Sequence, residues 1–175
     1  MTLAPVSHRT KTVAIMESLL EKQDLSALNF ESEVIELERL FENGRFRDKY
    51  LLWAVNDSYT CEEIFSTDFP DENIEKGLVD GETRQHNCER IANATAVLQE
   101  LFSAYPDRAT AAMYGVASYL QWHHRQYRLA SMYATLAYEK DPTQSLARLM
   151  HQIITCEIHS SNTSECEGQK ITLAS

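Results

Sequence analysis

Histidine and cysteine side chains gather near the C-terminus at spacings that suit a metal ion. On one helix, His151, Cys156 and His159 approach a common face, and Cys166 follows ten residues after Cys156. Structural zinc needs four such ligands around one point. Because Cys166 lies in a polar stretch without an apolar stripe, it is a poor fourth ligand. The pattern favours ordinary residues of a C-terminal helix, and we expect neither a metal ion nor a cofactor.

Other catalytic patterns are missing from the sequence. It contains no Gly-x-Ser-x-Gly elbow for a nucleophile, no glycine-rich phosphate loop and no Glu-x-x-His pair of a di-iron bundle. His86 and Cys88 are two residues apart, which places them on different sides of a helix. Paired carboxylates such as Glu31 and Glu38 arise by default on a charged helix face. We therefore predict that the protein is not an enzyme, and a metal-dependent enzyme is the least favoured alternative.

Aromatic side chains are numerous in one part of the chain and suggest a binding surface. Rigid amphipathic rings are good anchors for a protein partner. We predict that part of this group packs on the N-terminal helices and that a partner-binding face includes Tyr119, Trp122 and Tyr127. The whole group falls within 25 residues and comprises Tyr114, Tyr119, Trp122, Tyr127, Tyr133 and Tyr138.

Negative charge is concentrated in one part of the chain. The formal net charge is −10, and the residues after Ala104 contribute six acidic and six basic side chains, so the excess lies before them. Segment 57–82 holds nine acidic side chains and one lysine. This balance argues against a nucleic-acid groove, which needs a cationic face. The segment is read either as a solvated connector or as an acidic docking surface for a basic partner, with Glu62, Glu63, Asp71 and Glu72 as candidate contacts.

The elements that carry these residues are predicted to be helices. Five glycines and four prolines in 175 residues are too few for a sandwich or barrel, and apolar residues recur every three to four positions. We expect an all-α, single-domain bundle of about seven helices over residues 1–159, with a disordered tail at 160–175. Because Pro70, Gly77 and Gly81 interrupt it, the acidic connector 57–82 should form loops and short helical turns.

Individual helices are predicted from their apolar stripes and end signals. Asn43-Gly44 should supply a left-handed stop, Asp107 a helix cap, and Asp141-Pro142 the first turn of the last helix. The helix at Tyr127–Glu139 has Leu129, Met132 and Leu136 as its large apolar residues, with Ala130, Ala134 and Ala137. The other predicted helices are Thr10–Gln23, Phe30–Phe41, Arg45–Val55, Glu82–Ser103 and Arg108–Trp122.

The cysteines and the ends of the chain bear on where the protein acts. We expect reduced thiols, with Cys61, Cys88 and Cys156 at least partly buried. The first ten residues lack the apolar core of a signal peptide, and no apolar run is long enough to span a bilayer. The protein is therefore predicted to be cytoplasmic, with no membrane partner.

The best-patterned stretch, Ala109–Pro142, is 34 residues long, which is the period of a tetratricopeptide repeat. That repeat packs two antiparallel helices closely. Tyr114 occupies the aromatic position of the first helix, and Ser118, Ala130 and Ala137 occupy small positions. Pro142 closes the unit, whereas Gln121 and Ala134 stand where larger rings are usual. We therefore expect a tetratricopeptide-like hairpin plus a capping helix over 105–158.

The same region resembles the helical C-terminal half of a domain family of unknown function from actinobacteria and their phages. The likeness covers residues 45–158 and implies a helical fold, while the strand-rich N-terminal half of that family is absent here. An Arg-Asp motif, Arg47-Asp48, matches upstream. The longer matching stretches are Tyr105–Ala109, Val116–Leu120, Leu129-Ala130 and Asp141-Pro142, followed by Leu146–Leu149.

Together these features predict a non-enzymatic interaction module. Its partner is a protein, with a homo-oligomer left open, and neither nucleic acid nor a membrane is expected to bind directly. A second hypothesis is an acidic phage or mobile-element protein that blocks the basic cleft of a nucleic-acid-binding protein. Arg47, Asp48, Asp107 and Arg148 are interpreted as structural caps and ion pairs.

Overall fold

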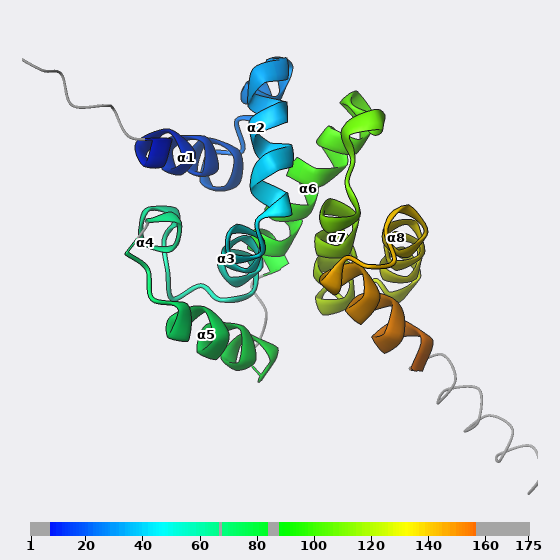
Figure 1. Ribbon diagram of the computed structural model, residues 1–175. Helices are drawn as coiled ribbons and strands as arrows, with labels where there is room; N and C mark the ends of the chain where they lie inside the picture. Colours follow the sequence, from blue (N-terminus) through cyan, green and yellow to red (C-terminus); the bar gives the residue numbers. More distant parts are fainter. Residues whose placement is uncertain (1–7, 67, 84–87, 157–175) are drawn as a thin grey trace, which may run out of the picture.

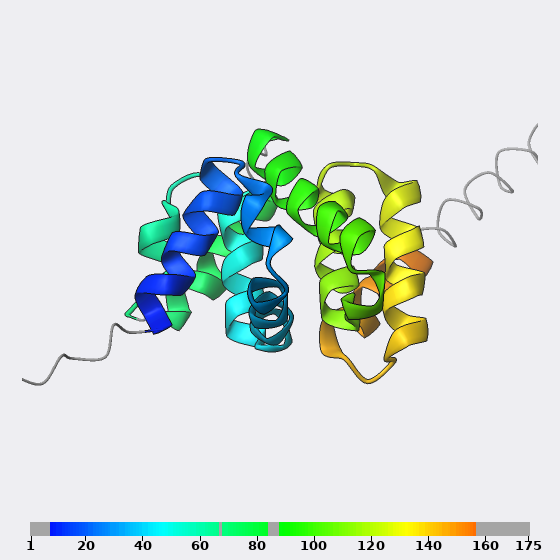
Figure 2. The same ribbon diagram turned by 90° about the horizontal axis from the view of Figure 1, so that it is seen from above.

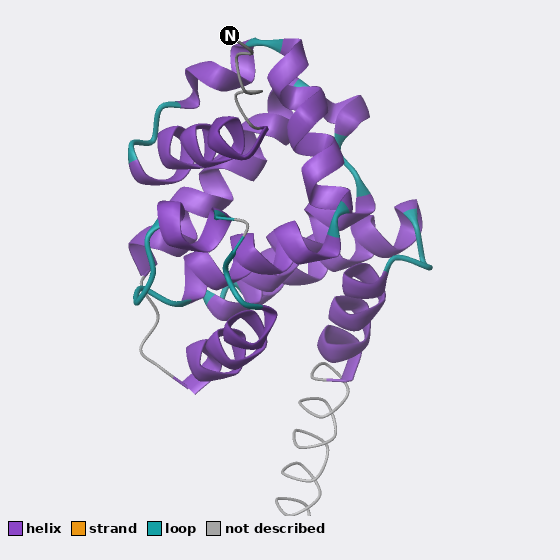
Figure 3. Cartoon of the chain, turned by 60° about the vertical axis from the view of Figure 1, so that its left-hand side comes forward, coloured by secondary structure: helices purple, strands orange, loops and turns teal. Residues whose placement is uncertain are grey.

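The protein is all-helical, as predicted (Figure 3). The computed structural model describes residues 8–66, 68–83 and 88–156, and no strand occurs in these ranges. The helices are α1 (His8–Met16), α2 (Glu31–Glu42), α3 (Gly44–Val55), α4 (Cys61–Phe65), α5 (Asp71–Thr83), α6 (Cys88–Ala104), α7 (Ala111–His123) and α8 (Tyr127–Lys140), followed by a helical segment at 145–156. Helical turns at Glu17–Glu21, Leu25–Asn29 and Pro106–Arg108 complete the elements.

The helices form two groups joined by α6. Helices α1 to α5 lie on one side, and α7, α8 and segment 145–156 lie on the other (Figures 1 and 2). Helix α6 packs against α3 and α7 and so contacts both groups. Its buried residues supply the middle of a continuous core, and they are Ile91, Ala94, Thr95, Val97, Leu98 and Leu101.

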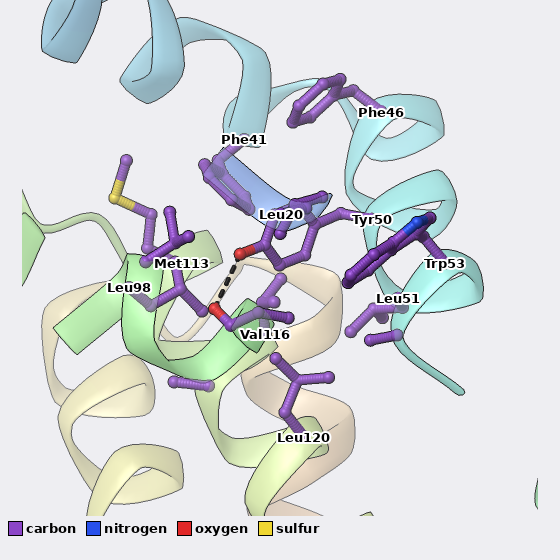
Figure 4. Close-up of a cluster of buried hydrophobic side chains, with 14 of the residues drawn as sticks. Leu20, Phe41, Phe46, Tyr50, Leu51, Trp53, Leu98, Met113, Val116 and Leu120 are labelled. Atoms are coloured by element: carbon purple, nitrogen blue, oxygen red, sulfur yellow. Dashed lines mark hydrogen bonds between the residues drawn. The ribbon is translucent and has the colours of Figure 1, made fainter. Parts of the chain in front are cut away.

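Helix α3 is the centre of the core. Tyr50 and Trp53 are almost completely buried, and Figure 4 shows their rings among side chains of α2, α6 and α7. The phenol of Tyr50 donates a 2.7 Å hydrogen bond to the carbonyl of Ala94, which satisfies a polar group that burial would otherwise penalise. Phe41 meets Tyr50 edge to face at 5.0 Å. The first group of helices is thereby fixed to α6.

Helices α7 and α8 form the hairpin that the sequence placed at Ala109–Pro142. Small residues face inward, and Ala130, Ala134 and Ala137 of α8 are all buried. The hydroxyl of Ser118 on α7 donates a buried 2.9 Å hydrogen bond to the carbonyl of Ala130. Gly115 lies so close to segment 145–156 that an added Cβ would be 3.2 Å from Cγ of Leu146. Small side chains therefore set the close approach of these three helices.

The prediction that 57–82 consists of loops and short turns is wrong in its second half. Segment 71–83 is the continuous helix α5, and Gly77 lies inside it rather than at a break. The reason is close packing: a Cβ at Gly77 would lie 2.6 Å from Cδ1 of Leu52 on α3. The amide of Asn56 also donates a 3.2 Å hydrogen bond to the carbonyl of Gly77.

Three predicted end signals are also corrected. Asn43 has a φ of −79° rather than a left-handed value, and its side chain caps α3 by accepting from the backbone N–H of Phe46 at 3.1 Å. Thr110, not Asp107, caps α7, because its hydroxyl accepts from the N–H of Met113 at 3.3 Å. The last helix starts after Gln144, whose side chain accepts from the N–H of Ala147 at 2.7 Å.

Several boundaries and exposures differ from expectation as well. Glu82 belongs to α5 rather than to the next helix, which begins at Cys88 in the described part of the chain. The first predicted helix ends as a π-helical turn at Glu17–Glu21. Cys61 is buried, as predicted, but Cys88 and Cys156 are exposed; all three are free thiols. The predicted tail, 160–175, lies outside the described residues.

Candidate interaction surface

The outer face of α8 carries three large apolar side chains. Leu129 is 38% exposed, Met132 45% and Leu136 38%. They recur at positions i, i+3 and i+7, which places them in one row along the helix. We call this row the α8 stripe. The sequence grouped these residues with Ala130, Ala134 and Ala137 as one apolar set, whereas the structure turns the alanines toward α7 and the larger side chains toward solvent.

The α8 stripe stands out from the rest of the described surface. Five of the eight exposed large hydrophobic side chains in the described ranges lie on α8, and a sixth, Leu149, lies on segment 145–156. Single exposed leucines are common on proteins, but a contiguous row is typical of interaction sites. The five on α8 are Tyr127, Leu129, Met132, Leu136 and Tyr138.

An aromatic cluster adjoins the stripe where α8 meets α6 and α7. Tyr133 is four residues after Leu129 and three before Leu136, so it lies beside both. Its ring is 5.8 Å from Phe102 and 6.2 Å from Tyr114, between ring centres. Phe102 and Tyr114 are half-buried and their ring centres are 4.5 Å apart. Burial raises the pKa of Tyr114, and Tyr133 itself is buried, so this cluster packs α8 against α6 and α7.

The predicted aromatic contacts are only partly brought together. Tyr119 and Trp122 are neighbours near the end of α7, with ring centres 6.4 Å apart, and both are half-buried. His123 lies against them, 4.3 Å from Tyr119 and 5.0 Å from Trp122 between ring centres. Tyr127 is exposed at the first position of α8. Tyr127 is therefore the most accessible ring of the three, and the partner-binding role of all three stays a prediction.

The four acidic residues that were predicted to contact a partner differ in the contacts that they make within the chain. Glu63 accepts a 2.8 Å hydrogen bond from the backbone N–H of Thr60, in a reciprocal capping box at the start of α4, and this lowers the pKa of Glu63. Asp71 forms an ion pair with Arg45. Glu62 and Glu72 are exposed in the first turns of α4 and α5. Only these last two are free of a described structural task.

The set of His151, Cys156, His159 and Cys166, at which no metal ion was expected, lies only partly within the described residues. His151 stacks on the ring of Tyr138, with ring centres 4.3 Å apart, and Cys156 is exposed. His159 and Cys166 lie outside the described residues. Among the residues that are described, no group of three or more His, Cys, Asp or Glu side chains is placed to hold a metal ion.

Lys49 is a buried cation that the sequence interpretation missed. Its ammonium donates a 2.6 Å hydrogen bond to the carbonyl of Ser66 and lies 5.7 Å from the ring centre of Phe69. Burial, followed by the nearby charge of Arg45, lowers the pKa of Lys49 to about 8. The signal was available, because Phe46 and Trp53 stand three residues before and four after Lys49, on the apolar side of α3. The lysine ties α3 to the connection between α4 and α5.

Comparisons of the chain with protein-family models, with curated proteins and with solved structures find no match. The two resemblances described above therefore stay predictions. Within the described ranges, no helix has the length and apolar character needed to cross a membrane.

Proposed function

We propose that the protein is a non-enzymatic helical module that binds another protein in the cytoplasm through the α8 stripe. The observation that supports this is the outward position of Leu129, Met132 and Leu136, combined with the inward position of the alanines between them. In this proposal, α7 and α8 form a tetratricopeptide-like unit whose second helix presents its outer face to the partner.

The physical reason is the cost of exposed apolar surface. Burying a leucine or methionine side chain fully is worth about 1.5–3 kcal/mol relative to leaving it in water. Somewhat less than half of that gain is still available at each stripe position, because these residues are 38–45% exposed. A row at i, i+3 and i+7 also matches the way an amphipathic helix face docks against a partner.

Site-specific crosslinking tests the proposal. A photoreactive phenylalanine analogue placed at Leu136 should give a crosslinked adduct with a protein in native cells. The matched control carries the analogue at Ile35, which is 46% exposed on α2 and should give no such adduct. Equal crosslinking at both positions, or none at Leu136, would contradict the proposal.

A second candidate function rests on the acidic segment 57–82, which carries most of the excess negative charge. Exposed carboxylates in the first turns of α4 and α5 suit a basic partner, such as a nucleic-acid-binding protein of the kind that a phage protein blocks. Changing Glu62 and Glu72 to lysine should then abolish capture of that partner. The fold should be unaffected, because Glu63 and Asp71, which have structural contacts, are left in place. Unchanged capture would reject this function.

A further inference from the structure

We infer that the partner of the α8 stripe is a second copy of this chain, in which the two α8 helices pack antiparallel about a two-fold axis near Met132. This inference rests on the proposed function and names the partner for the same surface. Three features of the described residues support it: the spacing of the stripe, the charges at its two ends, and the distribution of charge over the whole molecule.

The spacing of the stripe suits pairing with itself. Leu129 lies three residues before Met132, and Leu136 lies four residues after it. In an antiparallel pair centred near Met132, Leu129 of one copy meets Leu136 of the other at both ends of the contact. Such a two-fold interface uses the same patch twice. The two methionines then meet in the middle, where their flexible side chains fill irregular gaps well.

The charges at the two ends of α8 favour the antiparallel direction. Arg128 stands beside the stripe near the start of the helix, and Glu139 stands near its end. They are eleven residues apart, which is close to three turns, so both lie on the same side of α8. Both side chains are exposed, and neither has an ion-pair partner among the described residues. Antiparallel packing sets each Arg128 near the other copy's Glu139, whereas parallel packing leaves both Arg128 side chains at one end of the interface and both Glu139 side chains at the other.

The distribution of charge removes the main obstacle to self-association. A chain with a net charge of −10 repels its own copies. The excess negative charge, however, lies before residue 105, and much of it is in 57–82. Helices α4 and α5, which carry that segment, lie at the opposite end of the molecule from α8 (Figure 1). Two copies that meet through α8 therefore keep their acidic ends apart.

The interface is small, so the dimer should be weak. One helix face per copy is a small contact compared with standard specific interfaces, which begin at about 1,200 Å² in total. We expect a dissociation constant in the micromolar range rather than an obligate dimer. Sedimentation velocity of the full chain between low and high micromolar concentration should show the sedimentation coefficient rising from the monomer value to the dimer value.

Two substitutions test the surface. Met132→Asp should leave the protein monomeric at every concentration, because it places a carboxylate at the centre of the pair. Phe30→Asp is the matched control: Phe30 is 63% exposed, away from α8, and its replacement should not change the dimer. Because both positions are exposed, circular dichroism should show wild-type helix content in each variant.

A charge exchange tests the direction of packing. Arg128→Glu and Glu139→Arg should each weaken the dimer several-fold, since each places like charges together, and the double variant should restore it. A wild-type chain that stays monomeric throughout would overturn the inference, as would a dimer that Met132→Asp does not disturb. A dimer that each single variant weakens, without recovery in the double variant, would overturn the antiparallel arrangement.

The crosslinking and sedimentation results together distinguish a failure of the further inference from a failure of the proposed function. If the wild-type chain is monomeric but the analogue at Leu136 crosslinks to a different protein, the further inference fails and the proposed function stands. If the adduct is a crosslinked pair of this chain, both are supported. If there is neither a dimer nor an adduct at Leu136, both fail.

Discussion

Gly77 shows how a single missing side chain determines the packing of two helices. Its position inside α5 brings α5 against α3, where an added Cβ would meet Cδ1 of the completely buried Leu52. A glycine that breaks helices in isolation is here the residue that allows two of them to approach.

We therefore expect Gly77→Ala to destabilise the protein by about 1–2 kcal/mol. Overpacking a core costs about 1–3 kcal/mol, and the better helix propensity of alanine returns up to about 1 kcal/mol. Urea unfolding measures the change. Gly44→Ala is the control, because its added Cβ would be 3.4 Å from the end of the Arg47 side chain, and its stability should equal or exceed that of the wild type. Equal effects of the two substitutions would contradict the close packing at Gly77.

Lys49 should make stability depend on pH in the alkaline range. Burial lowers the pKa of Lys49 to about 8, from an ordinary value of 10.5. Between these values the unfolded chain binds a proton that the folded chain does not, so the free energy of unfolding gains a contribution that rises with pH. Below pH 8 both states are protonated, and the full cost of burying the ammonium applies.

The comparison with Lys49→Met isolates this effect. The free energy of unfolding of the wild type, minus that of the variant, should increase as the pH is raised from 7 to 10.5. Burial raises the pKa of Tyr50 and of Cys61, but these groups titrate in both proteins and cancel in the difference. A flat difference would show that folding leaves the pKa of Lys49 unchanged, and a difference that falls with pH would show that folding raises it; either would contradict the prediction.

At the level of single residues, the sequence predicted which side chains are exposed better than it predicted which neighbours they contact. The four predicted acidic contacts are all exposed, and two of them also have partners within the chain: Glu63 contacts Thr60 and Asp71 contacts Arg45. Such contacts depend on which short segments meet in space, and an acidic run alone contains no information about that. Tyr119 and Trp122 lie half-buried at the end of α7, and their role in a partner-binding face stays a prediction.

At the scale of elements, most helices were predictable and most of their ends were not. The apolar stripes place α2, α3, α7 and α8 within a few residues, because burying one face of a helix requires that periodicity. The ends depend on single hydrogen bonds, for which several neighbouring residues compete. Asp107 and Thr110 are both good caps by residue type, and only the path of the chain selects Thr110.

The cap of α7 gives a direct test of that selection. Thr110→Ala should destabilise the protein by about 1 kcal/mol, because it removes the acceptor for the N–H of Met113. Asp107→Ala should change the free energy of unfolding by less than about 0.5 kcal/mol, as is usual for an exposed residue without such a contact. Thermal or urea unfolding distinguishes the two. A larger loss from Asp107→Ala would place the cap at the residue that the sequence favoured.

The two faces of α8 show what helix periodicity leaves undecided. Ala130, Ala134 and Ala137 form one row, and Leu129, Met132 and Leu136 form the adjacent one. Hydrophobicity alone would bury the larger row. Close approach to α7 instead selects the smaller one, as the small positions of the 34-residue pattern had implied for Ala130 and Ala137.

At the scale of the whole molecule, α6 joins an N-terminal group of helices to a C-terminal hairpin, and the two ends differ in charge and in apolar exposure. One end is acidic, and the other is close to neutral with an apolar stripe. The all-helical class followed from composition and periodicity. The outward stripe did not, because it depends on how three helices pack together.

Oxidation of methionine by hydrogen peroxide, followed residue by residue with mass spectrometry, tests the central claim that the α8 stripe faces outward. Met132 is 45% exposed, whereas Met16, Met113 and Met150 are at most 1% exposed and serve as controls within the same chain. At a concentration too low for self-association, Met132 should oxidise at least about tenfold faster than these three. Oxidation of Met132 as slow as that of the buried methionines would contradict the account.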